Sequence, residues 1–220
     1  MSERQPLDDL PVRQLLEQLA STEPVPGGGS AAALVGALAA ALVHMVAQLT
    51  LRRDEQADAA GELREIALAA ATAQSELLNL AVLDANAFEA VVRARRLPRA
   101  DDQERDMRQL QVGAATREAT RVPMRTAELS ADVLDHAARI APIGTRNAVS
   151  DSGVAALLAA AAARSATLNV RINLGSLVDV DEPLRSEAAE SIDRVIARVE
   201  ATEDSTVATV EERIGAVPSA

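Results

Sequence analysis

The sequence contains no cysteine, no lysine, no tryptophan and no tyrosine, and Phe88 is its only aromatic residue. Without cysteine, the chain has no disulfide, no thiolate nucleophile and no cysteine metal ligand. Without lysine, it has no Schiff-base amine, and a glycine-rich segment cannot be a nucleotide-binding loop whose lysine reaches the phosphates. Carboxylates, amides, hydroxyls and arginines therefore remain as the candidate functional groups.

Alanine and leucine dominate the residues that are present, and no strand-like alternation lasts more than a few residues. This composition predicts an all-α protein, a bundle of about six helices. No linker rich in glycine, serine or proline divides the chain, so residues 1–220 are predicted to form a single domain. The expected helices cover residues 9–20, 30–51, 55–97, 101–140 with a kink or a new start at Pro123, 150–174 and 183–214.

Two of these helices, 30–51 and 150–174, are rich in alanine and are expected to be buried. Small side chains bury little apolar area per residue, so a stable core is expected to need a partner surface. The sequence therefore predicts a homodimer that packs helix on helix.

The net charge of −11 argues against binding to nucleic acid or to an anionic membrane surface. The N-terminus, MSERQPLDD, lacks the apolar core of a signal peptide, which favours a cytoplasmic location. Residues 30–51 carry no formal charge and are long enough to span a bilayer. Alanine adds little hydrophobicity, however, and His44 and Gln48 share one helical face, so a buried central helix without membrane contact is the expectation.

A glycine run, Gly27, Gly28 and Gly29, precedes the central helix. Glycine permits positive φ and lets another group approach the backbone closely. Ser30 is predicted to be the N-cap, so that the free amides and the helix dipole favour an anionic or carbonyl oxygen at the loop. A tight turn between two helices explains the same residues, and from the glycines alone it is the more frequent case.

Several polar residues interrupt the apolar helices, where burial is costly unless the groups are paired or used. Ser165, Asn169 and Asn173 recur every four residues on one helical face, either as polar links between helices or as part of a site. Asp84 lies one turn before Phe88. It is either a buried acid or base with a raised pKa, or an exposed carboxylate beside a core phenylalanine.

The remaining polar candidates have simpler explanations. Ser150 and Asp151 stand where a helix cap is expected. His44 and His136 show no metal-ligand spacing, so no metal site is predicted. Arg96 belongs to the densest basic run in the chain, which is either a solvated helix end or a resting place for a polyanionic substrate tail.

Four motifs occur in order along nearly the whole chain: PVPGGGSAAA at 24–33, LDANAFEAVVRARRLPR at 83–99, NAVSDSGVAA at 147–156 and NVRINL at 169–174. In wording and order they resemble the cyclodeaminase/cyclohydrolase family of tetrahydrofolate enzymes. The resemblance implies an all-α homodimer whose substrate is a tetrahydrofolate derivative and which needs no metal. It leaves two reactions open: cyclisation of 5-formimino-tetrahydrofolate with loss of ammonia, or hydrolysis of 5,10-methenyl-tetrahydrofolate.

With this resemblance, Asp84 and Asp151 are the predicted proton-transfer or pterin-anchoring residues. The predicted substrate-binding residues are Gly27, Gly28, Gly29, Ser30, Arg52, Arg53, Arg96, Asn147, Ser150, Asn169 and Asn173.

The chain departs from the family pattern at three points. The segment LRRDEQ keeps Arg52 and Arg53 but lacks the usual glycine and aromatic residue, Val82 replaces a second acid, and Thr145 replaces a common Gly-Asn. These departures keep an alternative open, in which the chain is a dimeric binding or scaffolding protein that has lost the activity.

Overall fold

The computed structural model describes residues 7–53, 58–177 and 181–215. Every regular element in these residues is helical, which confirms the predicted all-α class with six α-helices. The elements are η1 (Leu7–Asp9), α1 (Val12–Leu19), α2 (Gly28–Arg53), α3 (Ala60–Arg95), α4 (Asp102–Ile140), η2 (Arg146–Ala148), α5 (Val149–Leu174) and α6 (Glu182–Gly215).

Local sequence explains several helix boundaries. The carboxylate of Asp101 caps α4 by accepting a hydrogen bond from the Glu104 amide at 2.8 Å. Helix α3 ends at Arg95, shortly before Pro98, because the residue before a proline disfavours helical backbone. Of the two alternatives predicted at Pro123, a kink or a new start, the new start is wrong: α4 is one helix of 39 residues, and Pro123 is buried inside it. Tertiary packing on both halves of α4 therefore outweighs the hydrogen bond that proline cannot make.

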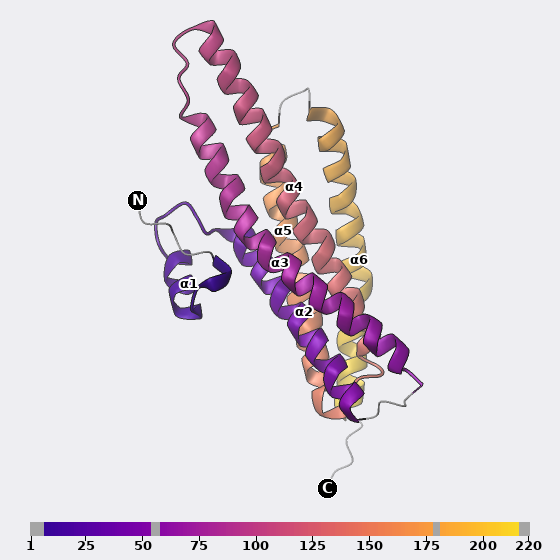
Figure 1. Cartoon of the computed structure of the whole chain (residues 1–220). Coiled ribbons are helices and arrows are strands. Elements are labelled where there is room, and N and C mark those ends of the chain that lie inside the picture. The colour runs from indigo at the N-terminus through magenta and orange to yellow at the C-terminus, as the bar shows by residue number, and fades with distance from the viewer. Residues whose placement is uncertain (1–6, 54–57, 178–180, 216–220) are drawn as a thin grey trace.

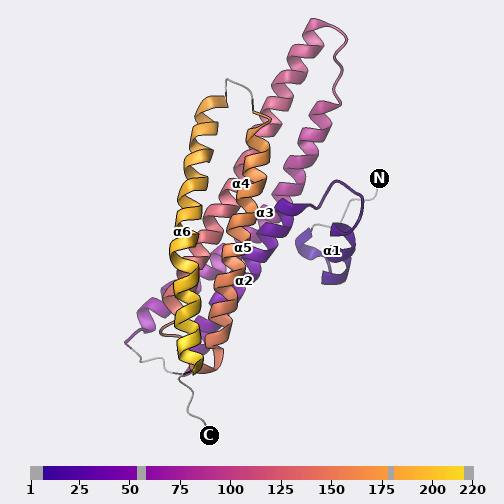
Figure 2. The same ribbon diagram turned by 180° about the vertical axis from the view of Figure 1, so that it is seen from behind.

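The helices form a bundle in which α2 packs against α3 on one side and α5 on the other, and α4 packs against all three of them (Figure 1). Helix α6 covers α4 and α5. The paired ends of α3 and α4 project beyond the other helices, and α1 lies beside the start of α2 (Figures 1 and 2). Helix α1 has no buried residue although it is strongly amphipathic.

Small side chains make the core tight. Alanines fill most of the contacts of α2 and α5, and the largest fully buried side chains come mainly from α3 and α4, such as Leu63, Leu77 and Leu134. Gly36 shows how close the helices approach, since a Cβ added there would lie 2.8 Å from the Ser130 Oγ and 3.2 Å from a Leu77 methyl group. The backbone of α2 thus approaches α3 and α4 through positions that carry little or no side chain.

One side of the α2–α5 pair is uncovered in the single chain. Leu38 of α2 is 59% exposed, and Leu168 and Ile172 of α5 are 62% and 73% exposed. By length and composition alone, three segments of the described chain are apolar enough to cross a membrane: α2, α3 and residues 146–174. The opposite sides of α2 and α5 are buried against the rest of the bundle.

Candidate active site at the start of helix α2

Helix α2 begins at Gly28, two residues earlier than the sequence predicted. The Ala31 amide donates to the Gly27 carbonyl at 3.0 Å, so Gly27 takes the cap position. Ser30 is therefore the third helical residue and not the N-cap. The positive φ that glycine permits is not used here, because no described glycine has one. The glycines act here through the absence of a side chain rather than through an unusual backbone conformation.

Ser30 turns its hydroxyl away from its own helix and towards α3. The Oγ atom lies 3.0 Å from the Ala81 carbonyl oxygen and 3.0 Å from Oδ2 of Asp84. The Ser30 backbone amide also donates to the Asp84 carboxylate. A carboxylate from α3 therefore meets a free amide at the start of α2, where the positive end of the helix dipole stabilises negative charge.

Gly29 makes this contact possible. A Cβ at position 29 would lie 2.1 Å from Oδ1 of Asp84, well inside van der Waals contact. Any side chain there would displace the carboxylate or separate the two helices. Glycine is thus required at position 29 by the place that Asp84 occupies.

The environment of Asp84 changes its proton affinity. Burial raises the pKa of Asp84 above its ordinary value of 3.8, and the hydrogen bonds from the Ser30 side chain and backbone partly oppose that effect. Among the groups in the described residues that shift this pKa there is no cation. The carboxyl group is therefore held in place but not neutralised by an ion pair, as a group that exchanges protons requires.

Asn169 of α5 flanks the other side of the glycine turn. A Cβ at Gly28 would lie 3.8 Å from its Oδ1 atom, which is ordinary contact, and Gly28 itself is exposed. The Asn169 Nδ2 group donates to the Ser165 carbonyl at 3.0 Å, which orients the amide. One turn further, Asn173 donates to the Ala119 carbonyl of α4 at 2.6 Å and thereby links the two helices.

The other predicted residues lie elsewhere in the bundle. Arg53 ends α2, and its guanidinium donates to the Thr145 hydroxyl at 3.0 Å. Ser150 and Asp151 are in the first turn of α5 but do not cap it, because the N-cap is Ala148 and no side chain bonds there. Asp151 and Asn169 are 18 residues apart, about 27 Å along the helix. The two predicted catalytic carboxylates, Asp84 and Asp151, therefore lie at opposite ends of the helical bundle.

Two groups of predicted residues follow from this arrangement. One lies at the start of α2 and contains Gly27, Gly28, Gly29, Ser30, Asp84 and Asn169, with Asn173 one turn away. The second lies at the end of α2 and the start of α5 and contains Arg52, Arg53, Asn147, Ser150 and Asp151.

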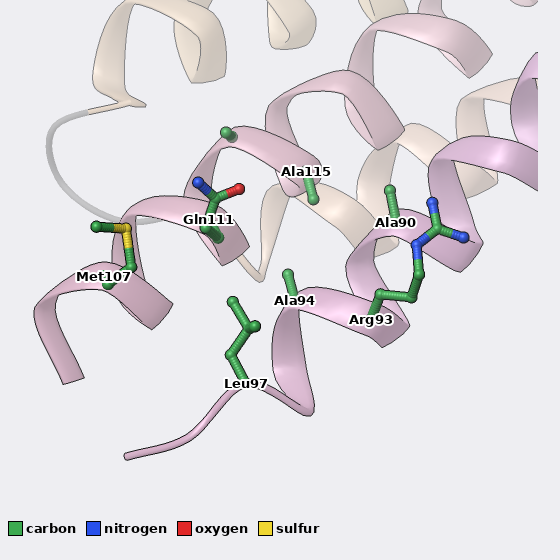
Figure 3. A pocket seen from close by; sticks show the side chains of 8 residues that line it. Ala90, Arg93, Ala94, Leu97, Met107, Gln111 and Ala115 are labelled. Carbon is green, nitrogen blue, oxygen red and sulfur yellow. The ribbon is translucent and has the colours of Figure 1, made fainter. Parts of the chain in front are cut away.

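Arg96 belongs to neither group. It follows the last residue of α3, 12 positions beyond Asp84, on the projecting hairpin. A groove of about 670 Å³ lies there between α3 and α4, lined by Leu97 and Arg93 on one side and Met107 and Gln111 on the other (Figure 3). Asp84 is not among its lining residues, so this groove is distinct from the site at the start of α2.

The histidines have structural surroundings. The Nδ1 atom of His44 lies 2.8 Å from the Ala67 carbonyl oxygen. Burial lowers the pKa of His136, which lies among the carboxylates and arginines that pair on the surface of α3 and α4. Within residues 7–53, 58–177 and 181–215, no cluster of three or more histidine and carboxylate side chains has an arrangement suited to a metal ion.

The sequence profile of the Formiminotransferase-cyclodeaminase family matches residues 11–211, almost the whole chain. The chain belongs to this family. A methenyltetrahydrofolate cyclohydrolase of Methylorubrum extorquens is 34% identical to this family member over 203 residues, which cover 92% of this chain and 97% of that one. The formimidoyltransferase-cyclodeaminase of Rattus norvegicus is 33% identical over 175 residues, and the match covers 32% of that longer protein.

A solved structure of the same fold supports the assignment. The crystal structure of formiminotetrahydrofolate cyclodeaminase from Thermotoga maritima superposes with a TM-score of 0.82 at 29% identity, covering 94% of this chain and 98% of that one. The resemblance carried by the four motifs is thus confirmed at the level of sequence family and of fold.

Proposed function

We propose that this family member is a one-carbon folate enzyme that hydrolyses 5,10-methenyl-tetrahydrofolate, with Asp84 as its proton-transfer residue. The observation that carries the proposal is the Asp84 carboxyl group, which is partly buried and held by Ser30 at the glycine turn, with no ion-pair partner in the part of the chain that the structure describes. The cyclohydrolase of Methylorubrum extorquens, which matches along 97% of its own length, supports this reaction.

In this reaction, Asp84 acts first as a base and then as an acid. The carboxylate takes a proton from water as the water oxygen bonds to the methenyl carbon between N5 and N10. The resulting carboxylic acid then donates that proton to N5 as the bond between N5 and this carbon breaks. The hydroxyl group on the carbon loses its proton to solvent and becomes the formyl carbonyl on N10, so one proton is released overall.

The second candidate reaction is the cyclodeaminase reaction, which the solved Thermotoga maritima structure favours. Here N10 of 5-formimino-tetrahydrofolate attacks the formimino carbon. The formimino nitrogen is protonated in the substrate, so attack by N10 leaves an amino group on the carbon; Asp84 accepts the proton of N10 and passes it to this amino group, which leaves as ammonia as the methenyl cation forms. Both reactions need one carboxyl group that exchanges a proton between two nitrogens or between water and nitrogen, and Asp84 meets that requirement in either.

We also assign the first group of residues to substrate orientation. The glycine turn offers backbone atoms without covering side chains, and Asn169 presents an amide beside Gly28. Amide and backbone groups of this kind match the donors and acceptors of a pterin ring. We propose further that the uncovered apolar side of α2 and α5 is covered by a second copy of the chain and not by lipid or nucleic acid, and that the protein is cytoplasmic.

Absorbance tests the proposal directly. Methenyl-tetrahydrofolate absorbs in the near ultraviolet, where a chain without tryptophan and tyrosine contributes almost nothing. We expect purified protein to accelerate the decay of this absorbance. Formation of the same absorbance from 5-formimino-tetrahydrofolate identifies the cyclodeaminase instead. A folded protein that changes neither signal supports the alternative of a binding or scaffolding protein.

Two variants on the same helix sharpen the test. Asp84→Asn should lower turnover about 10²–10⁴-fold, whereas Glu89→Gln, which alters a carboxylate ion-paired with Arg93 on the exposed surface, should leave it unchanged. Equal loss in both variants would count against a specific role for Asp84.

A further inference from the structure

The two groups of candidate residues lie at the two ends of the contact between α2 and α5, which we call the seam. At the upper end of the α2–α5 pair, a Cβ added at Gly28 would lie 3.8 Å from Oδ1 of Asn169, and at the lower end Arg53 reaches the segment before α5. Asp151 and Asn169 are separated by 18 residues, which is five full helical turns, so they lie on one line along α5. Gly28 and Arg53 are 25 residues apart, nearly seven turns, and lie on one line along α2.

Rows of exposed and half-exposed apolar residues run along both helices beside this seam. On α2 they follow each other at intervals of three and four, the pattern of a helix–helix interface, and on α5 the row is interrupted once, at the half-exposed Ser165 between Ala161 and Leu168. The members are Ala31, Val35, Leu38, Leu42, Met45 and Leu49 on α2, and Val154, Leu157, Ala161, Leu168 and Ile172 on α5. Soluble monomers seldom expose an apolar surface that extends along two long helices. The two helices lie side by side in Figure 2.

We propose that the active site is shared between two copies of the chain, with the Asp84 end of one protomer completed by the Asp151 end of its partner. The partner packs on the α2–α5 face with its helices antiparallel. A two-fold axis that lies in the interface and crosses the helices at their middle superposes each end of the seam on the opposite end. Asp151, Arg52 and Arg53 of one copy then face Gly28 and Asp84 of the other. This inference rests on the proposed function.

Charge complementarity selects this orientation. The Asp84 end offers a carboxyl group, a hydroxyl and an amide, and no cation shifts the pKa of Asp84 among the described residues. Arg171 is exposed beside Asn169 at this end, whereas three arginines, Arg52, Arg53 and Arg146, are exposed at the other end. A folate carries carboxylates beyond its pterin ring, so its site needs cations as well as a proton-transfer group. An axis parallel to the helices would keep the two sets apart, whereas the crossing axis unites them.

The middle of the face fits close approach of two helices. The point halfway between Asp151 and Asn169 is residue 160, and the neighbouring exposed residue is Ala161. On α2 the corresponding midpoint falls between Ala40, which is buried in the core, and Ala41, which is half-exposed. Small side chains at both crossing points allow the antiparallel helices to approach closely. The hairpin of α3 and α4 extends about 17 Å past Asp84 to the end of α3, and it would overhang the partner's end.

Complementation between two defective variants tests the shared site. We expect Asp84→Asn and Asp151→Asn homodimers each to lose at least about 100-fold in turnover. In a hybrid dimer with one copy of each, one site lacks both carboxylates and the other is intact, so half of the wild-type turnover should return. A hybrid no more active than its parents, or an Asp151→Asn homodimer with full turnover, would overturn the proposal. Circular dichroism confirms that each variant folds, and Arg52→Ala replaces Asp151→Asn if that variant does not.

Cysteine cross-linking tests the arrangement without any folate, because the chain has no cysteine of its own. We expect Ala161→Cys to form a disulfide with its own copy across the axis. Val154→Cys and Leu168→Cys, seven residues to either side, should cross-link with each other and not with themselves. Self-linking of Val154→Cys overturns the antiparallel arrangement. If the cross-links form as expected but wild-type protein does not act on either folate, the arrangement stands and the proposed function fails.

Discussion

Asp84 and Asp181 are both carboxylates removed from solvent, but their surroundings differ. Asp181, just before α6, has a side chain only 3% exposed and forms an ion pair with Arg117 of α4 at 2.8 Å. Asp84 has no such partner among the described residues and is held by the hydroxyl and amide of Ser30. An ion pair across two elements fixes one charged state and ties the elements together. A carboxyl group held by neutral donors, with a raised pKa, remains able to change its protonation state.

The largest effect is expected from removing the proton-transfer group. Asp84→Asn keeps the shape and much of the hydrogen bonding but cannot exchange a proton. We expect turnover to fall about 10²–10⁴-fold, while the free energy of unfolding changes by less than about 1 kcal/mol. Absorbance kinetics and thermal denaturation on the same preparation measure both quantities. Unchanged turnover would remove Asp84 from the mechanism.

The corresponding substitution in the ion pair between Asp181 and Arg117 should lower stability and leave turnover unchanged. Asp181→Asn leaves the Arg117 guanidinium without its partner, and we expect the free energy of unfolding to fall by about 2–3 kcal/mol. Turnover per folded molecule should remain at the wild-type value. A urea titration combined with activity normalised to folded protein measures the split, and a loss of turnover at full stability would show that the two carboxylates are not functionally distinct.

Substitutions at two adjacent glycines should have a smaller effect, and the substitution at Gly28 is the control for the one at Gly29. Gly29→Ala places a methyl group where the Asp84 carboxylate lies, so we expect loss of activity and destabilisation by about 1–3 kcal/mol. Gly28→Ala adds a methyl group at ordinary contact distance from Asn169 and should fold normally. The bulkier Gly28→Val should weaken folate binding more than folding. If Gly28→Val instead melts the protein and leaves the affinity per folded molecule unchanged, the loop is only a turn.

The smallest effect concerns pH. Because burial raises the pKa of Asp84, activity that requires its carboxylate should decline at a pH above 3.8 as the solution is acidified. Ser30 lowers this pKa, so Ser30→Ala should move the decline to higher pH. Stability changes with pH in the opposite direction to activity. Because the pKa of Asp84 is higher in the folded than in the unfolded chain, protonation of Asp84 stabilises the fold at a pH below the unfolded pKa. This contribution is lost as the pH rises through the folded pKa. A decline at the same pH in wild type and Ser30→Ala would contradict the assignment.

The sequence predicted the helical class, the helix order and the glycine turn because these depend on local composition and periodicity. It missed the role of Ser30, which local pattern makes a cap but which bonds to residues 51 and 54 positions away. It named Asp84 and Asp151 together because both lie in family motifs, but sequence spacing cannot tell which end of a bundle a motif occupies. The continuity of α4 through Pro123 was likewise decided by tertiary packing.

The alanine-rich contact between α2 and α5 has a consequence for the mobility of the site. Alanine has no rotamers to lose, so packing it demands no side-chain entropy, and it has none to regain by shifting. The distance between the two ends of the seam is therefore set by backbone against backbone. The functional groups at the two ends are therefore held at a fixed separation. A bound substrate would have to adapt to this separation, because it could not change it.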